Sequence, residues 1–169
     1  MDAHERLEQL LDEEALKKII EETDAEMKHK HAVLSEKAAG MDNVETYRKL
    51  LDYCFDKCAA YLDDPANMKA VLLEPRHLQQ AYDTLVGADE FKTIGGEEYK
   101  GFPRVIAMTI LAGSEVSAAD CALHVLGKKD KDAAGALEAL GNIYREYVRE
   151  AIAYGNGERK KVGLTGKVD

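Results

Sequence analysis

The stretch FPRVIAMTILAG, residues 102–113, decides the fold class. Proline is well placed in the first turn of a helix, where its missing N–H group costs no hydrogen bond. The sequence therefore predicts a helix that starts at Pro103, and a further short helix that starts at Ser117 and ends at Gly127. The apolar side chains of the first helix surround it on all sides, which is typical of the buried centre of a bundle. They are Val105, Ile106, Met108, Ile110 and Leu111.

Segments with helical periodicity lie on both sides of this stretch. On its N-terminal side, apolar residues at three- and four-residue spacing predict long helices over residues 12–40 and 42–64. Asp42 and Glu45 resemble a capping box at the start of the second. Two shorter helices are expected to follow, each opened by a proline, over residues 65–73 and 75–87.

The last predicted helix, residues 132–154, is the most regular. Its larger side chains follow a 3-4-3-4 spacing, which is the seam of a coiled-coil-like packing surface. Tyrosine is enriched in interface cores because it combines apolar area with a polar tip. We therefore expect this seam either to bind a protein partner or to pack on residues 105–111 of the same molecule. The predicted interface residues are Leu137, Leu140, Tyr144, Tyr147 and Tyr154.

Residues 88–102 interrupt the helical pattern. Two short segments flank Gly95-Gly96, as in a β-hairpin, although a loop explains the same residues. We therefore expect an all-α protein, an irregular multi-helix bundle with either a small β-hairpin or a loop near residues 91–100. Residues 1–155 form a single helical-bundle domain in this prediction, and residues 156–169 form a flexible basic C-terminal tail.

Composition and charge argue against several classes of protein. The net charge is −9, and an acidic body repels phosphate backbones, so no nucleic acid partner is expected. No unbroken apolar run approaches the roughly 20 residues that a membrane-spanning helix needs, so no membrane partner is expected either. Three cysteines cannot form a complete set of intrachain disulfides, and the acidic first residues do not resemble a secretory leader. Both observations favour a cytoplasmic location.

Four side chains could bind zinc. Cys54 and Cys58 are one helical turn apart, as are Cys121 and His124, and three thiolates with one imidazole suit tetrahedral zinc. The spacing is less specific than paired Cys-x2-Cys knuckles. Burial is the alternative explanation, because cysteine is among the most buried residue types and both residues of the first pair lie in an apolar stripe.

Other ligand sets are less well supported by the pattern. Two Glu-x-x-His pairs, Glu26/His29 and Glu74/His77, resemble di-iron ligands, but their positions fit solvated charges and a helix cap better. An aromatic small-molecule site near Tyr82 and Tyr99 is a further hypothesis. N-terminal carboxylates could bind magnesium, although their spread around the helix indicates a solvated surface. These are Glu5, Glu8, Glu13, Glu14, Glu21, Glu22 and Glu26.

The sequence thus leads to two functional hypotheses. The first is a helical binding or scaffold protein that acts through helix-face protein–protein contacts and self-associates, with a protein or a second copy as partner. The second is a metal-binding protein or metal-dependent enzyme that uses zinc through the Cys/His set or magnesium through the N-terminal carboxylates. The first is favoured because no nucleophile has a recognisable partner base, and whether the chain is an enzyme stays open.

Overall fold

A computed structural model describes residues 1–75, 77–95, 102–127 and 129–155. Within these ranges the chain forms eight α-helices and a short 3-10 turn, and it contains no strand. The prediction of an all-α bundle is therefore confirmed for the described part of the chain. The helices are α1 (Ala3–Leu10), α2 (Glu13–Lys37), α3 (Val44–Asp63), α4 (Pro65–Leu73), α5 (His77–Gly87), α6 (Asp89–Gly95), α7 (Phe102–Leu126) and α8 (Lys131–Gly155), and the turn is Ala38–Gly40.

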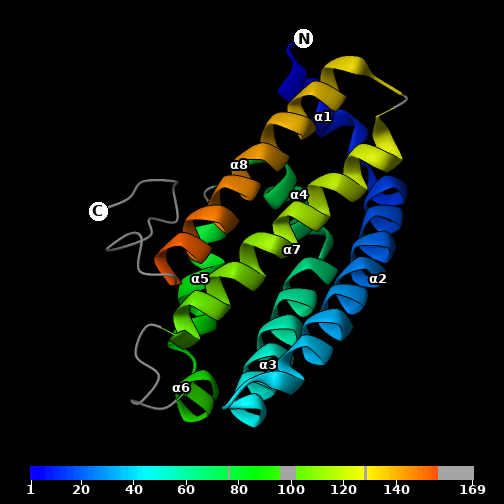
Figure 1. The fold of residues 1–169 in the computed structure, drawn as a ribbon. Helices are drawn as coiled ribbons and strands as arrows, with labels where there is room; N and C mark the ends of the chain where they lie inside the picture. The colour runs from blue at the N-terminus through cyan, green and yellow to red at the C-terminus, as the bar shows by residue number, and fades with distance from the viewer. Residues whose placement is uncertain (76, 96–101, 128, 156–169) are drawn as a thin grey trace.

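Helix α7 lies at the centre of the bundle (Figure 1). Helix α8 packs along its length on one side, and the pair α2 and α3 packs against it on the other. The shorter helices α4 and α5 also contact α7, and α1 packs against α8. Helix α7 is therefore covered by neighbours on most of its surface, as expected for a helix that is apolar all round.

Helix α7 continues through the serines where the sequence predicted a break. The hydroxyl of Ser114 donates to the carbonyl oxygen of Ile110 at 2.7 Å, and that of Ser117 donates to Gly113 at 3.2 Å. Each serine thus binds its own helix four residues back instead of capping a new one. The prediction of a helix start at Ser117 is wrong, whereas the predicted end at Gly127 is confirmed to within one residue.

Small residues let α7 and α8 approach closely. Ala118, Ala119 and Ala122 are buried, and a Cβ added at Gly141 of α8 would lie 3.7 Å from the Cβ of Ala119. These alanines also extend the apolar stretch of α7, so by length and composition this helix could cross a membrane. However, 72% of its most apolar window is buried inside the bundle, and the core helix of a bundle meets the same criterion.

Aspartates fix several helix starts. Asp12 accepts a hydrogen bond from the backbone N–H of Ala15 at 2.9 Å, and Asp64 accepts one from Ala66 at 2.9 Å. Each carboxylate satisfies a backbone donor that the helix itself leaves free, so the predicted starts of α2 and α4 are confirmed. Helix α3 instead begins after Asn43, without a side-chain cap, and the predicted capping box at residue 42 is wrong.

The first half of the expected hairpin is helical. Residues 91–95 belong to α6, and residues 96–101 lie outside the described residues. Phe91 is buried against Tyr53, with ring centroids 6.1 Å apart, and Ile94 packs on the core one turn later. Burial of two side chains at helical spacing outweighs the strand preference of residues such as Thr93 and Ile94.

The carboxyl group of Glu115 lies in the core. Glu115 of α7 is completely buried, and neither of its oxygens has a hydrogen-bond partner. Burial disfavours the charged carboxylate and raises the pKa of Glu115 to about 8. The group is therefore mostly protonated in the folded protein at neutral pH.

The tyrosine at the centre of α8 satisfies a carbonyl at the end of α4. The hydroxyl of Tyr144 donates to the carbonyl oxygen of Val71 at 2.7 Å, and Tyr144 is fully buried. Val71 lies in the last turn of its helix, where carbonyl groups have no partner within the helix. This bond therefore ties α4 to α8.

Replacing Glu115 with Gln should flatten the pH dependence of stability. Between pH 4.5 and about 8 the folded state holds a proton that the unfolded state has lost, so the free energy of unfolding falls as pH rises. The free energy of unfolding should fall by about 1.4 kcal/mol per pH unit in this range. We expect Glu115→Gln to lack this decline in urea unfolding measured across that range. Parallel pH profiles of the two proteins would contradict a buried, titrating Glu115.

Tyr144→Phe should lower the free energy of unfolding by about 1–2 kcal/mol, because it leaves the Val71 carbonyl buried without a donor. The measurement is urea unfolding followed by circular dichroism. Tyr53→Phe is the control: Tyr53 also counts as buried, at 7% exposed against 0% for Tyr144, but within the described ranges its hydroxyl makes no hydrogen bond to another helix, and we expect a change below about 0.5 kcal/mol. An equal effect of the two substitutions would show that the Val71 contact adds nothing.

Candidate functional site

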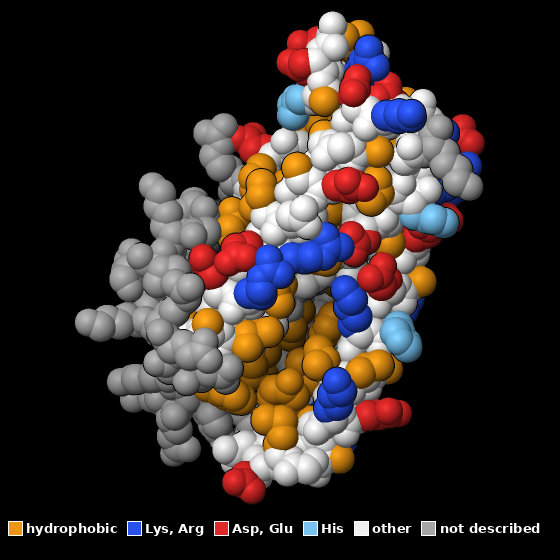
Figure 2. Space-filling view, turned by 45° about the horizontal axis from the view of Figure 1, so that its top comes forward, with side chains coloured by type: hydrophobic (Ala, Val, Ile, Leu, Met, Phe, Trp, Pro, Cys, Tyr) orange, Lys and Arg blue, Asp and Glu red, His pale blue; other side chains and the backbone are white. Residues whose placement is uncertain are grey.

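An apolar groove runs over α7 between α2 and α8. It has a volume of about 390 Å³, with α7 as its floor and α2 and α8 as its walls. Figure 2 shows a hollow lined by hydrophobic side chains and open to solvent on the face of the molecule that it displays. We call it the α7 groove. Its lining residues are Met27, His29, Lys30, Val33, Leu34, Phe55, Thr109, Ile110, Gly113, Ser114 and Val148.

Glycine keeps the floor of the α7 groove open. Nothing lies within 4 Å of a Cβ added at Gly113, so the space above it is empty. A glycine inside a helix costs roughly 0.5–1 kcal/mol relative to alanine, and no packing requirement offsets that cost here. The walls are apolar and only half-buried at Val33, Leu34 and Val148. Ile152, one turn beyond Val148, is 48% exposed and extends the wall of α8.

Lys and Arg side chains gather along the rim of the hydrophobic hollow in Figure 2. Lys30 lines the groove itself, and its ammonium donates to Ser117 Oγ at 2.6 Å. On α8, Arg145 lies three residues before Val148 and Arg149 directly follows it. Arg145 forms an ion pair with Asp120, and Arg149 forms one with Glu146 at 2.7 Å. Neither arginine is among the lining residues, and Lys30 also forms an ion pair with Glu26 at 3.4 Å, so each of the three cations has a carboxylate partner.

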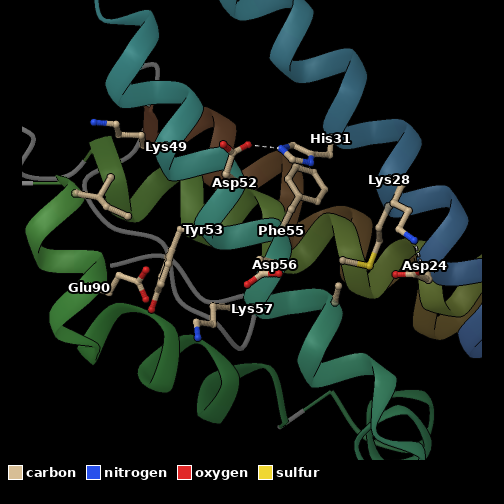
Figure 3. Close-up of a pocket in the computed structure, with 13 residues that line it drawn as sticks. Asp24, Lys28, His31, Lys49, Asp52, Tyr53, Phe55, Asp56, Lys57 and Glu90 are labelled. Atoms are coloured by element: carbon tan, nitrogen blue, oxygen red, sulfur yellow. Dashed lines mark hydrogen bonds and ion pairs between the residues drawn. The ribbon is translucent and has the colours of Figure 1, made fainter.

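A larger, charged cleft lies between α2, α3 and α6 (Figure 3). Its volume is about 730 Å³. His31 Nε2 lies 2.7 Å from Asp52 Oδ1, and the imidazole stacks on the ring of Phe55 with centroids 4.9 Å apart. Lys57 Nζ lies 5.7 Å from the centroid of the Tyr53 ring. His31 is half-buried at the edge of the core.

The charged cleft balances its own charges. Lys28 forms an ion pair with Asp24 at 2.9 Å, and this hydrogen bond raises the pKa of Lys28. Three lysines in the lining face four carboxylates, and no serine, threonine or cysteine lines the cleft beside His31. A histidine–aspartate pair alone provides a base but no nucleophile to activate, so this cleft is the weaker candidate for a site.

The four predicted zinc ligands are not brought together. Cys54 and Cys58 are buried in α3, where burial raises the pKa of the Cys54 thiol to about 12. Cys121 and His124 turn to α2 instead: the thiol donates to Glu26 at 3.2 Å, and His124 Nδ1 lies 3.1 Å from Glu22. In the described ranges, no group of three or more His, Cys, Asp or Glu could hold a metal ion. The two pairs lie on helices that face different neighbours, which spacing alone did not reveal.

The other predicted ligands are also dispersed. Glu26 binds Lys30 and Cys121, while His29 lies exposed at the α7 groove. The side chain of His77 and all of Tyr99 lie outside the described residues. Tyr82 is half-buried, and burial raises its pKa. The N-terminal carboxylates Glu5, Glu8, Glu13, Glu14 and Glu21 are exposed and Glu22 is half-buried, and they do not converge on one point.

The predicted interface of α8 lies inside the molecule. Leu137, Leu140, Tyr144 and Tyr147 are all buried, and Tyr154 is half-buried. Helix α8 makes its most extensive contact with α7, so the heptad-like spacing reports packing within the chain. The sequence analysis missed the α7 groove, for which Gly113 in the middle of an apolar helix was the available signal.

Comparison with protein-family models, with curated proteins and with solved structures finds no match for this chain, and the functional assignment therefore rests on geometry and chemistry.

Proposed function

We propose that this protein is a helical binding protein that docks an acidic amphipathic helix of a protein partner in the α7 groove. The observation that carries the proposal is the groove itself, an open apolar channel whose floor is kept free of side chains at Gly113. Exposed apolar surface with a polar rim is typical of a binding site.

The arrangement of helices around the α7 groove suits a helical partner. Two helical walls, α2 and α8, flank a helical floor, which is how amphipathic helices are held in other helix-in-groove complexes. A partner helix would insert apolar side chains at positions i, i+3, i+4 and i+7, one of them over Gly113. Burial of each such side chain stabilises the complex by roughly 1.5–3 kcal/mol before the entropy cost of association.

The charges around the groove favour an acidic partner. Lys30 lines the groove from α2, and on α8 Arg145 and Arg149 are close in sequence to the lining residue Val148. Carboxylates along the flanks of a partner helix would complement these cations, and such complementarity steers association and sets the orientation of the partner. The same cations disfavour a basic helix, which gives the proposal a specificity that can be measured.

The Gly113 variants test the proposal. The probe is a pair of designed amphipathic helical peptides with the same apolar face and with either Glu or Lys on the flanks. We expect the acidic peptide to bind more tightly, in fluorescence anisotropy, and Gly113→Phe to weaken its binding at least about tenfold, because the ring fills the empty space over the floor.

Gly113→Ala is the matched control. A single methyl group enters open space, so the variant should keep most of the peptide affinity. It should also raise the free energy of unfolding by about 0.5–1 kcal/mol, because alanine restricts the unfolded chain. Unchanged binding by Gly113→Phe, or equal binding of the acidic and basic peptides, would refute the proposal. A concentration-dependent dimer in light scattering that Gly113→Phe abolishes would replace the partner helix with a second copy of the chain.

Reversing one rim charge tests the choice of partner. Arg149→Glu should weaken the acidic peptide about threefold to tenfold and reduce the salt dependence of its binding. Lys18→Glu makes the same change of charge at an exposed position of α2 that lies nine residues before Met27, the first groove residue of that helix, and it should leave the affinity nearly unchanged. Equal effects of the two substitutions would mean that net charge, rather than the rim, controls binding.

A further inference from the structure

A small cavity of about 240 Å³ lies between α3, α5, α6 and α7, away from the α7 groove. Buried side chains from three helices form its inner part: Cys58 of α3, Leu85 of α5 and Leu111 of α7. We call this cavity the apolar chamber. A dry protein cavity of roughly 150 Å³ is already large enough to bind benzene. The apolar chamber can therefore hold a group the size of an aromatic ring or a branched aliphatic side chain.

Three residues line both the apolar chamber and the charged cleft, so the two cavities meet at them. They are Tyr53 and Lys57 of α3 and Glu90 of α6. Lys57 and Glu90 are exposed, whereas Tyr53 is buried. Figure 3 shows the side chains of Lys57 and Glu90 extending toward Tyr53 from their two helices. The opening of the apolar chamber thus presents one cation and one carboxylate beside an aromatic ring.

The two charges at this opening are not paired with each other. The Lys57 ammonium lies 5.7 Å from the centroid of the Tyr53 ring, and within the described ranges it forms no ion pair with Glu90 or any other carboxylate. The other lysines of the charged cleft are paired: Lys28 with Asp24 at 2.9 Å, and Lys49 with its neighbour on α3 at 3.4 Å. The gap between Lys57 and Glu90 therefore leaves room for a ligand that carries both charges.

The hydroxyl group of Tyr53 is a further polar group without a partner at the opening. Within the described ranges it forms no hydrogen bond, although the side chain is buried. Burial, and then the nearby Glu90 carboxylate, raise the pKa of Tyr53, so the hydroxyl keeps its proton at neutral pH and can donate it in a hydrogen bond. Polar groups of buried side chains are usually paired, so this hydroxyl points to a partner from outside the chain.

We infer that the apolar chamber binds a free α-amino acid with an apolar side chain. The side chain fills the inner part, the carboxylate pairs with Lys57 and accepts a hydrogen bond from Tyr53, and the ammonium pairs with Glu90. One carbon atom of an α-amino acid carries all three groups, which matches an apolar chamber that opens between two opposite charges.

The charges of the opening disfavour a ligand with a single charge. A simple carboxylate would meet Glu90, and a simple amine would meet Lys57, and like charges brought together without compensation cost affinity. A zwitterion offers each of them a complementary partner. The inference is independent of the α7 groove and goes beyond the proposed binding of a helix.

Titration calorimetry of the full chain at about pH 7 tests the inference with L-phenylalanine and two analogues that each lack one charge. 3-Phenylpropionate keeps the ring and the carboxylate, and 2-phenylethylamine keeps the ring and the ammonium. We expect phenylalanine to bind about fivefold more tightly than either analogue, because each analogue leaves one charge of the opening without a partner.

Removing either charge of the protein should remove one of these two preferences. Lys57→Gln should bind phenylalanine no better than 2-phenylethylamine, because the carboxylate then has no cation as partner. Glu90→Gln should bind phenylalanine no better than 3-phenylpropionate. Both positions are exposed, so we expect both variants to fold. Lys49→Gln is the matched control: Lys49 lies about two helical turns before Lys57 on α3, and its loss should leave both preferences unchanged.

Filling the apolar chamber should abolish binding of all three probes. Ala88→Phe places a ring at a half-buried lining position, whereas Gly113→Phe fills the separate α7 groove and should leave binding unchanged. The charge variants keep the test valid even if Ala88→Phe is unstable. The inference is overturned if phenylalanine does not bind at millimolar concentration, if either analogue binds as tightly, or if Lys49→Gln changes the preferences as much as Lys57→Gln does.

Discussion

Burial of α7 is the constraint on which the rest of the structure depends. Its apolar side chains point in every direction, and leaving them in water would forfeit the main favourable term of folding. No single neighbour can cover a helix on all sides, so α8 lies along one side and α2 with α3 along the other, while α4 and α5 close the remaining side. The order of the helices in the chain is therefore less informative than their shared contact with α7.

Two residues of α7, Gly113 and Glu115, depart from its pattern of buried apolar side chains, and they are two positions apart in the sequence. Gly113 lies where the neighbouring helices leave the surface uncovered, and Glu115 lies where they cover it completely. Two residues correspond to about 200° around a helix, so the two positions face almost opposite sides. A glycine in a helix interior and an unpaired acid in a core both lower stability, and positions that break local rules without visible compensation are where function is expected.

Local signals predicted the local structure well. Asp12, Asp64 and Gly127 marked helix ends correctly, because a cap depends on neighbours in sequence. Ser117 was misassigned because its hydroxyl bonds the carbonyl of Gly113 in its own helix instead of capping a new one, and residues 91–95 were misassigned because Phe91 is buried by tertiary contacts. The heptad spacing of α8 identified a packing surface but not its partner, since periodicity is the same for a neighbour in the chain and for a neighbour in another molecule.

Little of the candidate site could be predicted, since the site depends on which helices lie together. The α7 groove combines side chains of α2, α3, α7 and α8, and the His31–Asp52 contact joins two helices that pack side by side. The zinc hypothesis had suitable residue types, but Cys58 turns to α7 and Cys121 turns to α2. Spacing along one helix shows which side chains share a face, but it does not show which other helix packs against that face.

The three buried thiols have a consequence for how the bundle can be observed. Cys54, Cys58 and Cys121 lie on helices that meet α7 or belong to it, and burial raises the pKa of each thiol, to about 12 for Cys54 and Cys121. A thiol reagent attacks the thiolate, which the closed bundle disfavours at neutral pH. A reagent can therefore label these thiols only after a helix separates from the bundle, and the labelling rate depends on how often this local opening occurs. The labelling rate of Cys121 therefore reports how often α2 separates from α7, and the rates of Cys54 and Cys58 report how often α3 separates from α7.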